Sequence, residues 1–391
     1  MNKAYDFDKV IDRSLTFSSK WCVKKNELPM WVADMDFEAA PEIMEALQKR
    51  LSNGIFGYTY VPDEWYKAYQ YWWKKRHNLK INKDSLIFTT GVVPAISTAV
   101  RKLTTPAENV LIQPPVYNVF YNSISNNGRN ILESPLIYSN GSYSIDWEDL
   151  ESKLSDPQTT LMILCNPHNP IGKIWNKRTL AKIGNLCAKY NVTVISDEIH
   201  CDLTDPGKNY IPFASVSDTC VDISITCIAP TKCFNIAGLQ TAAVMVPNKN
   251  LNHKMWRALN TDEVAEPNAF AIAATIAAFT KGDKWLDSLR KYIKINKNRV
   301  REFISKKIPK VSVVSSEATY LLWFDCSKIT DNSEELAEFI RNKTGLFLAK
   351  GTLYGGNGQH FLRFNPACPK VLLEDGLSRL EKGIKSYLKR V

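Results

Sequence analysis

Two residues of this chain, Lys232 and Asp197, combine a reactive side chain with a position at the end of an apolar run. Lys232 comes shortly after the run at 223–229. Because burial of an ammonium group is costly, desolvation there would lower the pKa of Lys232 and leave a nucleophilic amine that can form an imine with an aldehyde. Asp197 ends the run at 192–196 and needs a cationic partner. A protonated pyridine nitrogen would provide that charge.

Further positions extend this pattern. Gly91, Val92 and Val93 open a predicted helix, whose free N–H groups and dipole suit a phosphate. Tyr117 could stack on a flat ring, although a lone aromatic residue is more often part of a core. Arg363 is flanked by apolar residues and offers a fork of donors to a substrate carboxylate. An aldehyde, a pyridine and a phosphate in one molecule predict pyridoxal 5′-phosphate (PLP) as the cofactor.

Each of these residues also has an ordinary alternative. Lys232 taken alone fits an exposed loop lysine, and Arg363 fits a structural ion pair. Asp197 fits a helix N-cap or, with neighbouring His200 and Asp202, a metal ligand. The combination favours the cofactor interpretation, because Lys232 and Asp197 follow successive predicted strands. We therefore expect no metal in the site.

The elements that must position these residues are short apolar runs that alternate with helical patterns. This alternation predicts an α/β fold built from βαβ units around a mainly parallel sheet. Five of the six candidate strands lead directly into polar, Gly or Pro residues, and in open α/β sheets ligands bind beyond the carboxyl ends of the strands. The sequence therefore predicts one shared site at that edge. The candidate strands are 86–89, 110–112, 161–165, 192–196, 223–229 and 242–246.

Two regions flank this series. Pro41 opens a predicted helix that carries an apolar face and is closed by Gly54. After about residue 285 a long amphipathic helix begins near Asp283, followed by a β-rich stretch (311–314 and 320–324) and two more helices. This change of pattern predicts a second, smaller α+β domain.

Composition narrows the class of protein. The 391 residues are 45% hydrophobic and carry a formal charge of +10, but Lys and Arg are spread along the chain, so we expect no nucleic-acid partner. No run of 18 apolar residues and no signal-peptide core are present, which predicts a cytoplasmic protein without a membrane span. The nine cysteines, none with CxxC spacing, are expected to be buried free thiols.

Several motifs resemble the fold-type I PLP enzymes, the class I/II aminotransferase superfamily. They are most similar to its branch of cystathionine β-lyases and related C–S lyases, the MalY/PatB type. The resemblance covers nearly the whole chain. The motifs that carry it are Leu28-Pro-Met-Trp-Val-Ala-Asp-Met-Asp-Phe37, Phe56-Gly-Tyr58, Asn166-Pro-His-Asn-Pro-Ile-Gly172, Ser196-Asp-Glu-Ile-His200 and Lys232-Cys-Phe-Asn-Ile-Ala-Gly238.

The resemblance implies a three-layer, aspartate aminotransferase-like fold. Residues 1–45 would be an N-terminal segment belonging to the small domain, 46–284 the large PLP-binding domain, and 285–391 the small C-terminal domain. It also implies a homodimer with active sites shared across the interface. Tyr58 would reach the phosphate, and serve catalysis, in the neighbouring subunit.

The resemblance also implies individual roles at the cofactor. Lys232 would be the Schiff-base lysine and Asp197 the partner of the pyridinium nitrogen. Asn169, helped by His200, would hydrogen-bond the phenolic oxygen of PLP, and Tyr117 would stack on the ring.

Other residues would hold the phosphate and the substrate. Backbone donors at Gly91, Val92 and Val93, with the Thr231 hydroxyl, would bind the phosphate. Arg363 would hold the α-carboxylate of an amino-acid substrate, with Asn169 and the Ala33 backbone nearby.

Four positions depart from the family pattern. Ala229 stands where relatives often use Ser for the phosphate, and Gln240 where aspartate aminotransferases carry an Arg. Ile171 replaces the usual Thr of the Asn-Pro-Thr-Gly motif, and Cys22 an Asp after Lys-Trp. We expect these departures to affect how tightly the cofactor binds and which residues line the substrate pocket.

The resemblance predicts α,β-elimination from L-cystathionine or another cysteine S-conjugate, giving pyruvate, ammonia and a thiol. Transamination of a small or aromatic amino acid is the alternative, because the two reactions share every step up to the carbanion. A PLP-binding regulator without turnover is a third possibility, and it would act through a protein partner.

Overall fold

The large sheet of the computed structural model, which describes residues 5–390, has seven strands. Their spatial order is β2-β10-β9-β8-β7-β3-β4. All neighbouring pairs are parallel except those of β10, which runs antiparallel to both β2 and β9. The strands are β2 (Leu86–Thr89), β3 (Asn109–Ile112), β4 (Asn130–Glu133), β7 (Thr159–Cys165), β8 (Thr193–Asp197), β9 (Ser224–Ile228) and β10 (Ala242–Met245).

Helices cover both faces of this sheet, which is why its inner strands are apolar on both sides. Along β7, Leu161 and Ile163 pack with α3 and α8, while Met162 and Leu164 pack with α5 and α6 on the opposite face. The helices around the sheet are α1 (Pro41–Leu51), α2 (Asp63–His77), α3 (Val92–Leu103), α4 (Val119–Ser125), α5 (Trp147–Leu154), α6 (Lys177–Lys189), α7 (Asp218–Ile223), α8 (Lys249–Thr261) and α9 (Ala271–Lys281).

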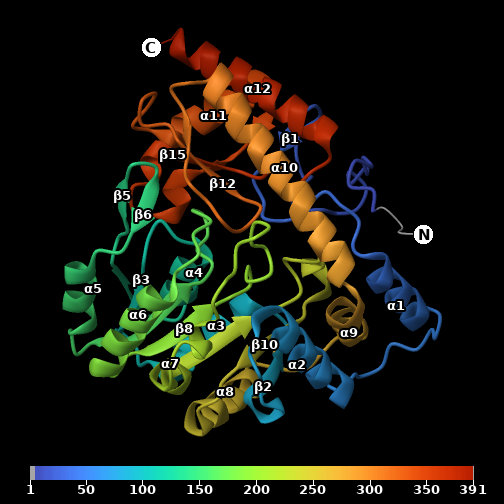
Figure 1. Ribbon diagram of the computed structural model, residues 1–391, viewed down its shortest axis with the longest axis vertical. Helices are drawn as coiled ribbons and strands as arrows, with labels where there is room; N and C mark the ends of the chain where they lie inside the picture. The colour runs from blue at the N-terminus through green and yellow to red at the C-terminus, as the bar shows by residue number, and fades with distance from the viewer. Residues whose placement is uncertain (1–4, 391) are drawn as a thin grey trace.

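A smaller antiparallel sheet lies at the other end of the molecule, in the order β11-β12-β15-β14 (Figure 1). Its strands are β11 (Ser312–Val313), β12 (Leu322–Asp325), β14 (Ala349–Lys350) and β15 (Phe361–Phe364). It shares an apolar core with α11 (Ser333–Thr344) and α12 (Lys370–Leu388). The long helix α10 (Asp283–Lys307) runs between the two regions and packs on α9 at one end and on α12 and β11 toward the other (Figure 1).

The N-terminal part of the chain pairs with the C-terminal part. Strand β1 (Leu28–Pro29) lies parallel to β13 (Leu346–Phe347). The segment that follows β1 then crosses toward the carboxyl ends of the large sheet. Residues 30–37 therefore lie between the two sheets: the Met30 carbonyl accepts from the Asn365 N–H just after β15, and Met35 is hydrogen-bonded to Asn235, beyond the end of β9.

The predicted α/β class with a mainly parallel sheet is confirmed, and so are the helix at Pro41–Leu51 and the long helix that begins at Asp283. The six predicted strands are present, one with the predicted ends and five with shifts of one or two residues. Patterns in the sequence did not indicate the edge strand β4, or the hairpin of β5 (Ile137–Ser139) and β6 (Ser142–Ser144). These strands are short and partly exposed, so they carry no apolar run.

Candidate active site

A cavity of about 170 Å³ opens at the carboxyl ends of β2, β7, β8 and β9. It receives residues from each of these strand ends, from the start of α3 and from the N-terminal segment. Its lining consists of Ala33, Thr90, Gly91, Val92, Val93, Pro94, Tyr117, Cys165, Asn169, Asp197, Ile199, His200, Thr231, Lys232 and Ala237. All but two of the residues predicted for the site are among them. The exceptions are Arg363, which contacts a lining residue, and Tyr58.

Lys232 lies largely buried in this cavity, four residues beyond the end of β9. Its Nζ donates a hydrogen bond of 2.7 Å to the carbonyl oxygen of Ala33. Burial, with help from the positive charge of Arg363, lowers the pKa of Lys232 to about 8. The exposed-lysine alternative is therefore wrong. An amine whose pKa lies close to neutral pH is suited to nucleophilic attack and to proton transfer.

Asp197 is the last residue of β8, and only 4% of it is exposed. Within residues 5–390, its carboxylate accepts one hydrogen bond, from the Ile199 N–H at 3.1 Å. Burial raises the pKa of Asp197 to about 6. A buried carboxylate with so little compensation calls for a cation in the cavity.

His200 and Asn169 also face the cavity. Burial, followed by the charges of Lys232 and Arg363, lowers the pKa of His200 to about 3, so the ring is neutral. Its Nδ1 is buried without a hydrogen-bond partner among the described residues. The Asn169 side chain accepts a hydrogen bond of 3.3 Å from Arg363. Both side chains can therefore engage a polar atom of a bound group.

The start of α3 forms the other end of the cavity. Gly91 is the N-cap of α3, and no side chain caps the helix there. The first N–H groups of the helix therefore remain available to an anion. Thr231 places a hydroxyl on the same cavity. Lys232 is the one cationic side chain among the lining residues, so an anion here would be held mainly by neutral donors.

Two of the positions that depart from the family pattern are buried and two are exposed, and none of them lines the cavity. Ala229 and Ile171 are each 1% exposed and belong to the apolar core. Gln240 is exposed, has a left-handed backbone (φ 50°) and does not line the cavity. Cys22 is exposed, whereas the other eight cysteines are buried free thiols as expected.

Arg363, on β15, is 5% exposed. Its guanidinium donates to Asn169 Oδ1 at 3.3 Å and to the Trp31 carbonyl at 2.7 Å, and it lies over the ring of Tyr354. Among residues 5–390 its hydrogen-bond partners are an amide and a backbone carbonyl rather than a carboxylate, and its buried Nε has no partner. The structural ion pair considered for Arg363 is therefore wrong, and the side chain remains free to bind an anionic ligand.

Tyr58 lies outside this cavity. It belongs to the irregular segment between α1 and α2, and its side chain is fully exposed. Ile55 and Tyr60 in the same segment are 72% and 79% exposed. Within a single chain, Tyr58 therefore does not join the residues with which it was predicted to act.

Residues 31–35 bring Ala33 to the wall of the cavity. They are held there by hydrogen bonds from side chains that sequence reasoning did not identify. Asn365 donates from Nδ2 to the carbonyls of Val32 and Asp34, each at 2.7 Å. Asn235 bonds both the N–H and the carbonyl of Met35.

Two further groups support the same wall. The Tyr320 hydroxyl donates to the Ala33 carbonyl at 2.9 Å. Lys20, fully buried, pairs with Asp36 at 2.7 Å, and Arg13 pairs with the other oxygen of Asp36. Asp36 belongs to the 28–37 motif, which gave a partial signal for it, whereas Lys20 lies outside that motif. A bond to a backbone carbonyl gives none.

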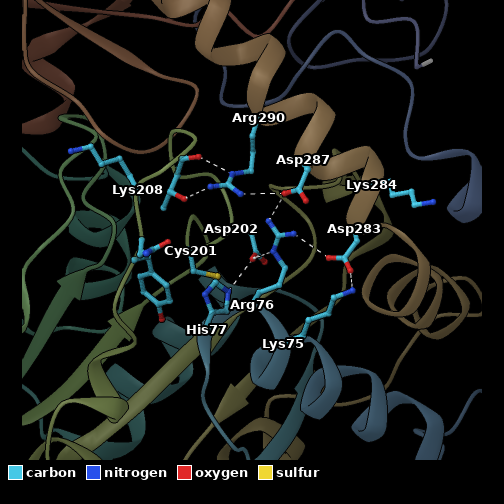
Figure 2. A pocket seen from close by; sticks show the side chains of 13 residues that line it. Lys75, Arg76, His77, Cys201, Asp202, Lys208, Asp283, Lys284, Asp287 and Arg290 are labelled. Atoms are coloured by element: carbon cyan, nitrogen blue, oxygen red, sulfur yellow. Dashed lines mark hydrogen bonds and ion pairs between the residues drawn. The ribbon is translucent and has the colours of Figure 1, made fainter. Parts of the chain in front are cut away.

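A second hollow, of about 450 Å³, lies between the end of α2 and the start of α10 (Figure 2). Here His77, Cys201 and Asp202 bring possible metal-ligand atoms within 4.8 Å of one another. Arg76, however, already occupies the centre of an acidic group, with its Nε 3.7 Å from Asp202. Figure 2 also shows its guanidinium between Asp283 and Asp287.

The carboxylate of Asp202 is thus compensated without an ion. It accepts from Trp72 Nε1 at 2.8 Å and pairs with His77 at 2.9 Å. His200 lines the cavity at the strand ends, whereas Asp202 faces the second hollow. The alternative metal set of Asp197, His200 and Asp202 is therefore not assembled.

The fold and the cavity define an α/β enzyme class whose site lies between the carboxyl ends of a mainly parallel sheet and a second, smaller sheet. The family model for aminotransferase class I and II matches residues 26–380. The chain belongs to this family. No described helix is long and apolar enough to cross a membrane.

Individual relatives match over nearly the full chain. Cystathionine beta-lyase PatB of Bacillus subtilis is 46% identical over 387 residues, which cover 97% of this chain and 100% of that protein. Cystalysin of Treponema denticola, whose crystal structure contains PLP, superposes with a TM-score of 0.95 at 34% identity, covering 98% and 99%. The PLP-bound C–S lyase of Staphylococcus hominis gives 0.91 at 33% identity, covering 97% and 99%.

Proposed function

We propose that the chain is a PLP-dependent carbon–sulfur β-lyase that converts L-cystathionine or another cysteine S-conjugate to pyruvate, ammonia and a thiol. The observation that carries this proposal is the cavity that unites Lys232 and Asp197 beneath the uncapped start of α3. The relatives support it, because PatB is named a cystathionine beta-lyase and the S. hominis structure a C–S lyase.

The residues of the cavity fit PLP. Asp197 is a buried carboxylate in need of a cation, which the protonated ring nitrogen would supply. The Asn169 amide and the unpartnered Nδ1 of His200 would hydrogen-bond the phenolic oxygen of PLP. Tyr117 would stack on the PLP ring. The free N–H groups at Gly91, with those of Val92 and Val93 and the Thr231 hydroxyl, would hold the phosphate.

Bound PLP supplies an aldehyde that condenses with amines and a charged ring that withdraws electrons from Cα. The Lys232 amine would hold it covalently until a substrate amine takes its place. Once freed, Lys232 would act as general base and remove the α-proton of the substrate, a role to which its lowered pKa is suited.

Arg363 would meanwhile fix the substrate carboxylate, next to Asn169 and the Ala33 backbone. With the α-proton removed, the Cβ–S bond breaks. A thiolate, the base of an acid with a pKa of about 8.5, leaves with little help from a proton donor. Lys232 would then displace the product amine from the cofactor, and the released enamine would hydrolyse with water to pyruvate and ammonia.

One assay separates this reaction from transamination, which uses the same residues up to the loss of the α-proton. The purified protein is incubated with L-cystathionine in the absence of any keto acid. Pyruvate and thiol should form, and Lys232→Ala should lower the rate by roughly 10²–10⁴-fold, the usual share of a general acid–base. A strict need for a keto acid acceptor would identify an aminotransferase instead.

The proposed function includes an arrangement of subunits and domains. We propose a cytoplasmic homodimer in which Tyr58 of each chain completes the phosphate end of the other chain's site, as its full exposure allows. We also propose 46–284 as the large domain and 285–391, joined by residues 1–45, as the small one. The β1–β13 pair supports that assignment for the N-terminal segment, whereas α1 packs on α9 of the large domain.

A further inference from the structure

The carbonyl of Ala33 accepts two hydrogen bonds inside the candidate site. Lys232 Nζ donates to it at 2.7 Å and the Tyr320 hydroxyl at 2.9 Å. A carbonyl oxygen has two lone pairs, so this acceptor is saturated. The Tyr320 hydroxyl therefore takes one lone pair and leaves the other, with its direction, to Lys232.

Tyr320 is built into this position. It is 1% exposed, and its ring lies 6.2 Å from that of His200, which lines the cavity. Burial raises the pKa of Tyr320 well above its ordinary value, so the hydroxyl remains a donor over the whole working pH range. Tyr320 donates no second hydrogen bond within residues 5–390, and the Ala33 carbonyl is its one acceptor.

The residue before it adopts an unfavourable backbone. Thr319 has φ 63°, a left-handed value that β-branched residues rarely accept. Its N–H donates to Leu203 at 2.7 Å, its carbonyl accepts from the buried Lys297, and its hydroxyl accepts from the N–H of Leu321. Such conformations persist where surrounding contacts enforce them, and they cluster at functional sites. Here the turn aims Tyr320 at Ala33.

The neighbouring carbonyls have their own anchors. Arg363 holds Trp31, Asn365 holds Val32 and Asp34, and Asn235 holds Met35. The segment is therefore fixed on both sides of Ala33 without Tyr320. Removal of the Tyr320 hydroxyl should therefore leave the fold intact, but it should loosen the Ala33 carbonyl itself, which none of these anchoring side chains contacts.

We propose that Tyr320 is a positioning residue for Lys232, acting through the shared Ala33 carbonyl. When Lys232 is not bound to the cofactor, this pair of bonds holds its amine at one place in the cavity. The amine then faces an incoming aldehyde, or the α-proton of a substrate, in a constant geometry. The inference rests on the proposed role of Lys232.

The test compares Tyr320→Phe with Tyr143→Phe. Tyr143 is about equally buried and is hydrogen-bonded to Asn357 and Trp323, but neither partner lines the cavity, whereas Ala33, the partner of Tyr320, does. Each apoprotein is mixed with PLP, and covalent capture is followed by absorbance. Tyr320→Phe should capture PLP roughly tenfold more slowly and lower kcat by a similar factor at unchanged KM, because misplacement of a reacting group costs rate. Tyr143→Phe should match the wild type.

Two outcomes would overturn the inference: wild-type capture and kcat in Tyr320→Phe, or a loss confined to KM. If Tyr320→Phe does not fold, Tyr320→Met takes its place, since a flexible methionine fills much of the buried space of the ring and has no hydroxyl to donate to the Ala33 carbonyl. It should show the same slow capture, and a wild-type rate would contradict us. Failure of the wild type itself to capture PLP would instead refute the proposed function.

Discussion

At the scale of single residues, the site is governed by burial of ionisable groups in a small cavity. Lys232 and Asp197 are both shifted toward their neutral forms, the lysine to a pKa of about 8 and the aspartate to about 6. Desolvation is the largest cause for each. A cofactor that brings a cation to Asp197 would reverse that shift, so PLP binding and ionisation of Asp197 should favour each other.

The pKa of Lys232 predicts how cofactor capture depends on pH. Only the neutral amine has a lone pair for the aldehyde, and a lowered pKa makes that form available at lower pH. The rate of PLP capture by the apoprotein should therefore rise with pH and level off above about 8. Stopped-flow absorbance over a pH series measures this midpoint.

Arg363→Gln tests the cause of that shift. The positive charge of Arg363 disfavours the ammonium form of Lys232, so its removal should move the midpoint to higher pH. An unchanged or lower midpoint in Arg363→Gln would contradict this cause, and a wild-type rate that keeps rising to the ordinary pKa of lysine, about 10.4, would contradict the lowered pKa itself.

At the scale of elements, the end of β8 contributes one acidic residue to the candidate site and the next acidic residue to the buried core. Asp197 faces the candidate site, and the next residue, Glu198, turns into the core with no exposed surface. Its carboxyl group interacts with the Ser196 hydroxyl at 2.8 Å, the Phe213 N–H at 2.9 Å and the hydroxyl of Tyr210. Burial raises the pKa of Glu198 to about 8, so this group is mostly protonated at neutral pH.

This buried acid makes stability depend on pH. Because the folded pKa lies above the unfolded value, Glu198 favours the native state at low pH, and that contribution is lost as pH rises through about 8. Glu198→Gln keeps a neutral group of the same shape. At about pH 9 it should be more stable than the wild type by on the order of 2 kcal/mol.

Thermal melting from acidic to alkaline pH checks this expectation. The control is Glu338→Gln, on the exposed side of α11, which should follow the wild-type curve. Equal pH dependence of the wild type and Glu198→Gln would show that another group governs the alkaline loss of stability.

At the scale of the whole molecule, the segment between α1 and α2 carries large apolar side chains at the surface. Ile55, Tyr58 and Tyr60 are each more than 70% exposed, and Phe56 is 51% exposed. Exposed groups of this kind mark contact surfaces. In the proposed homodimer this segment would pack on the partner subunit near the start of its α3.

Shared sites predict complementation between inactive variants. Lys232→Ala and Tyr58→Ala should each be inactive or severely impaired as homodimers. A hybrid of the two has one site with both residues intact, so random reassociation should restore roughly a quarter of wild-type activity in a two-fold symmetric dimer. The measurement is lyase activity after the two variants are co-refolded. Absence of restoration, with hybrids present, would place Tyr58 outside the partner's site.

By itself the sequence determined which strand ends carry polar chemistry. Apolar runs identify buried strands, and parallel strands bring their carboxyl ends to one edge, so Lys232, Asp197 and Asn169 could be placed together before any coordinates. Its motifs also matched a family with specific residues for a cofactor. These inferences depend on local order along the chain, which side-chain patterns report directly.

Only the tertiary structure decided how the N-terminal segment closes the site. Tyr320 and Ala33 are 287 residues apart, and Asn365 is more than 330 residues from the carbonyls that it holds. The acceptors are backbone oxygens, which every residue type carries, so the residue types at these positions do not indicate the hydrogen bonds. Arg363 shows the same limit: its type suggested an anion, but only packing showed that no carboxylate of the described chain neutralises it.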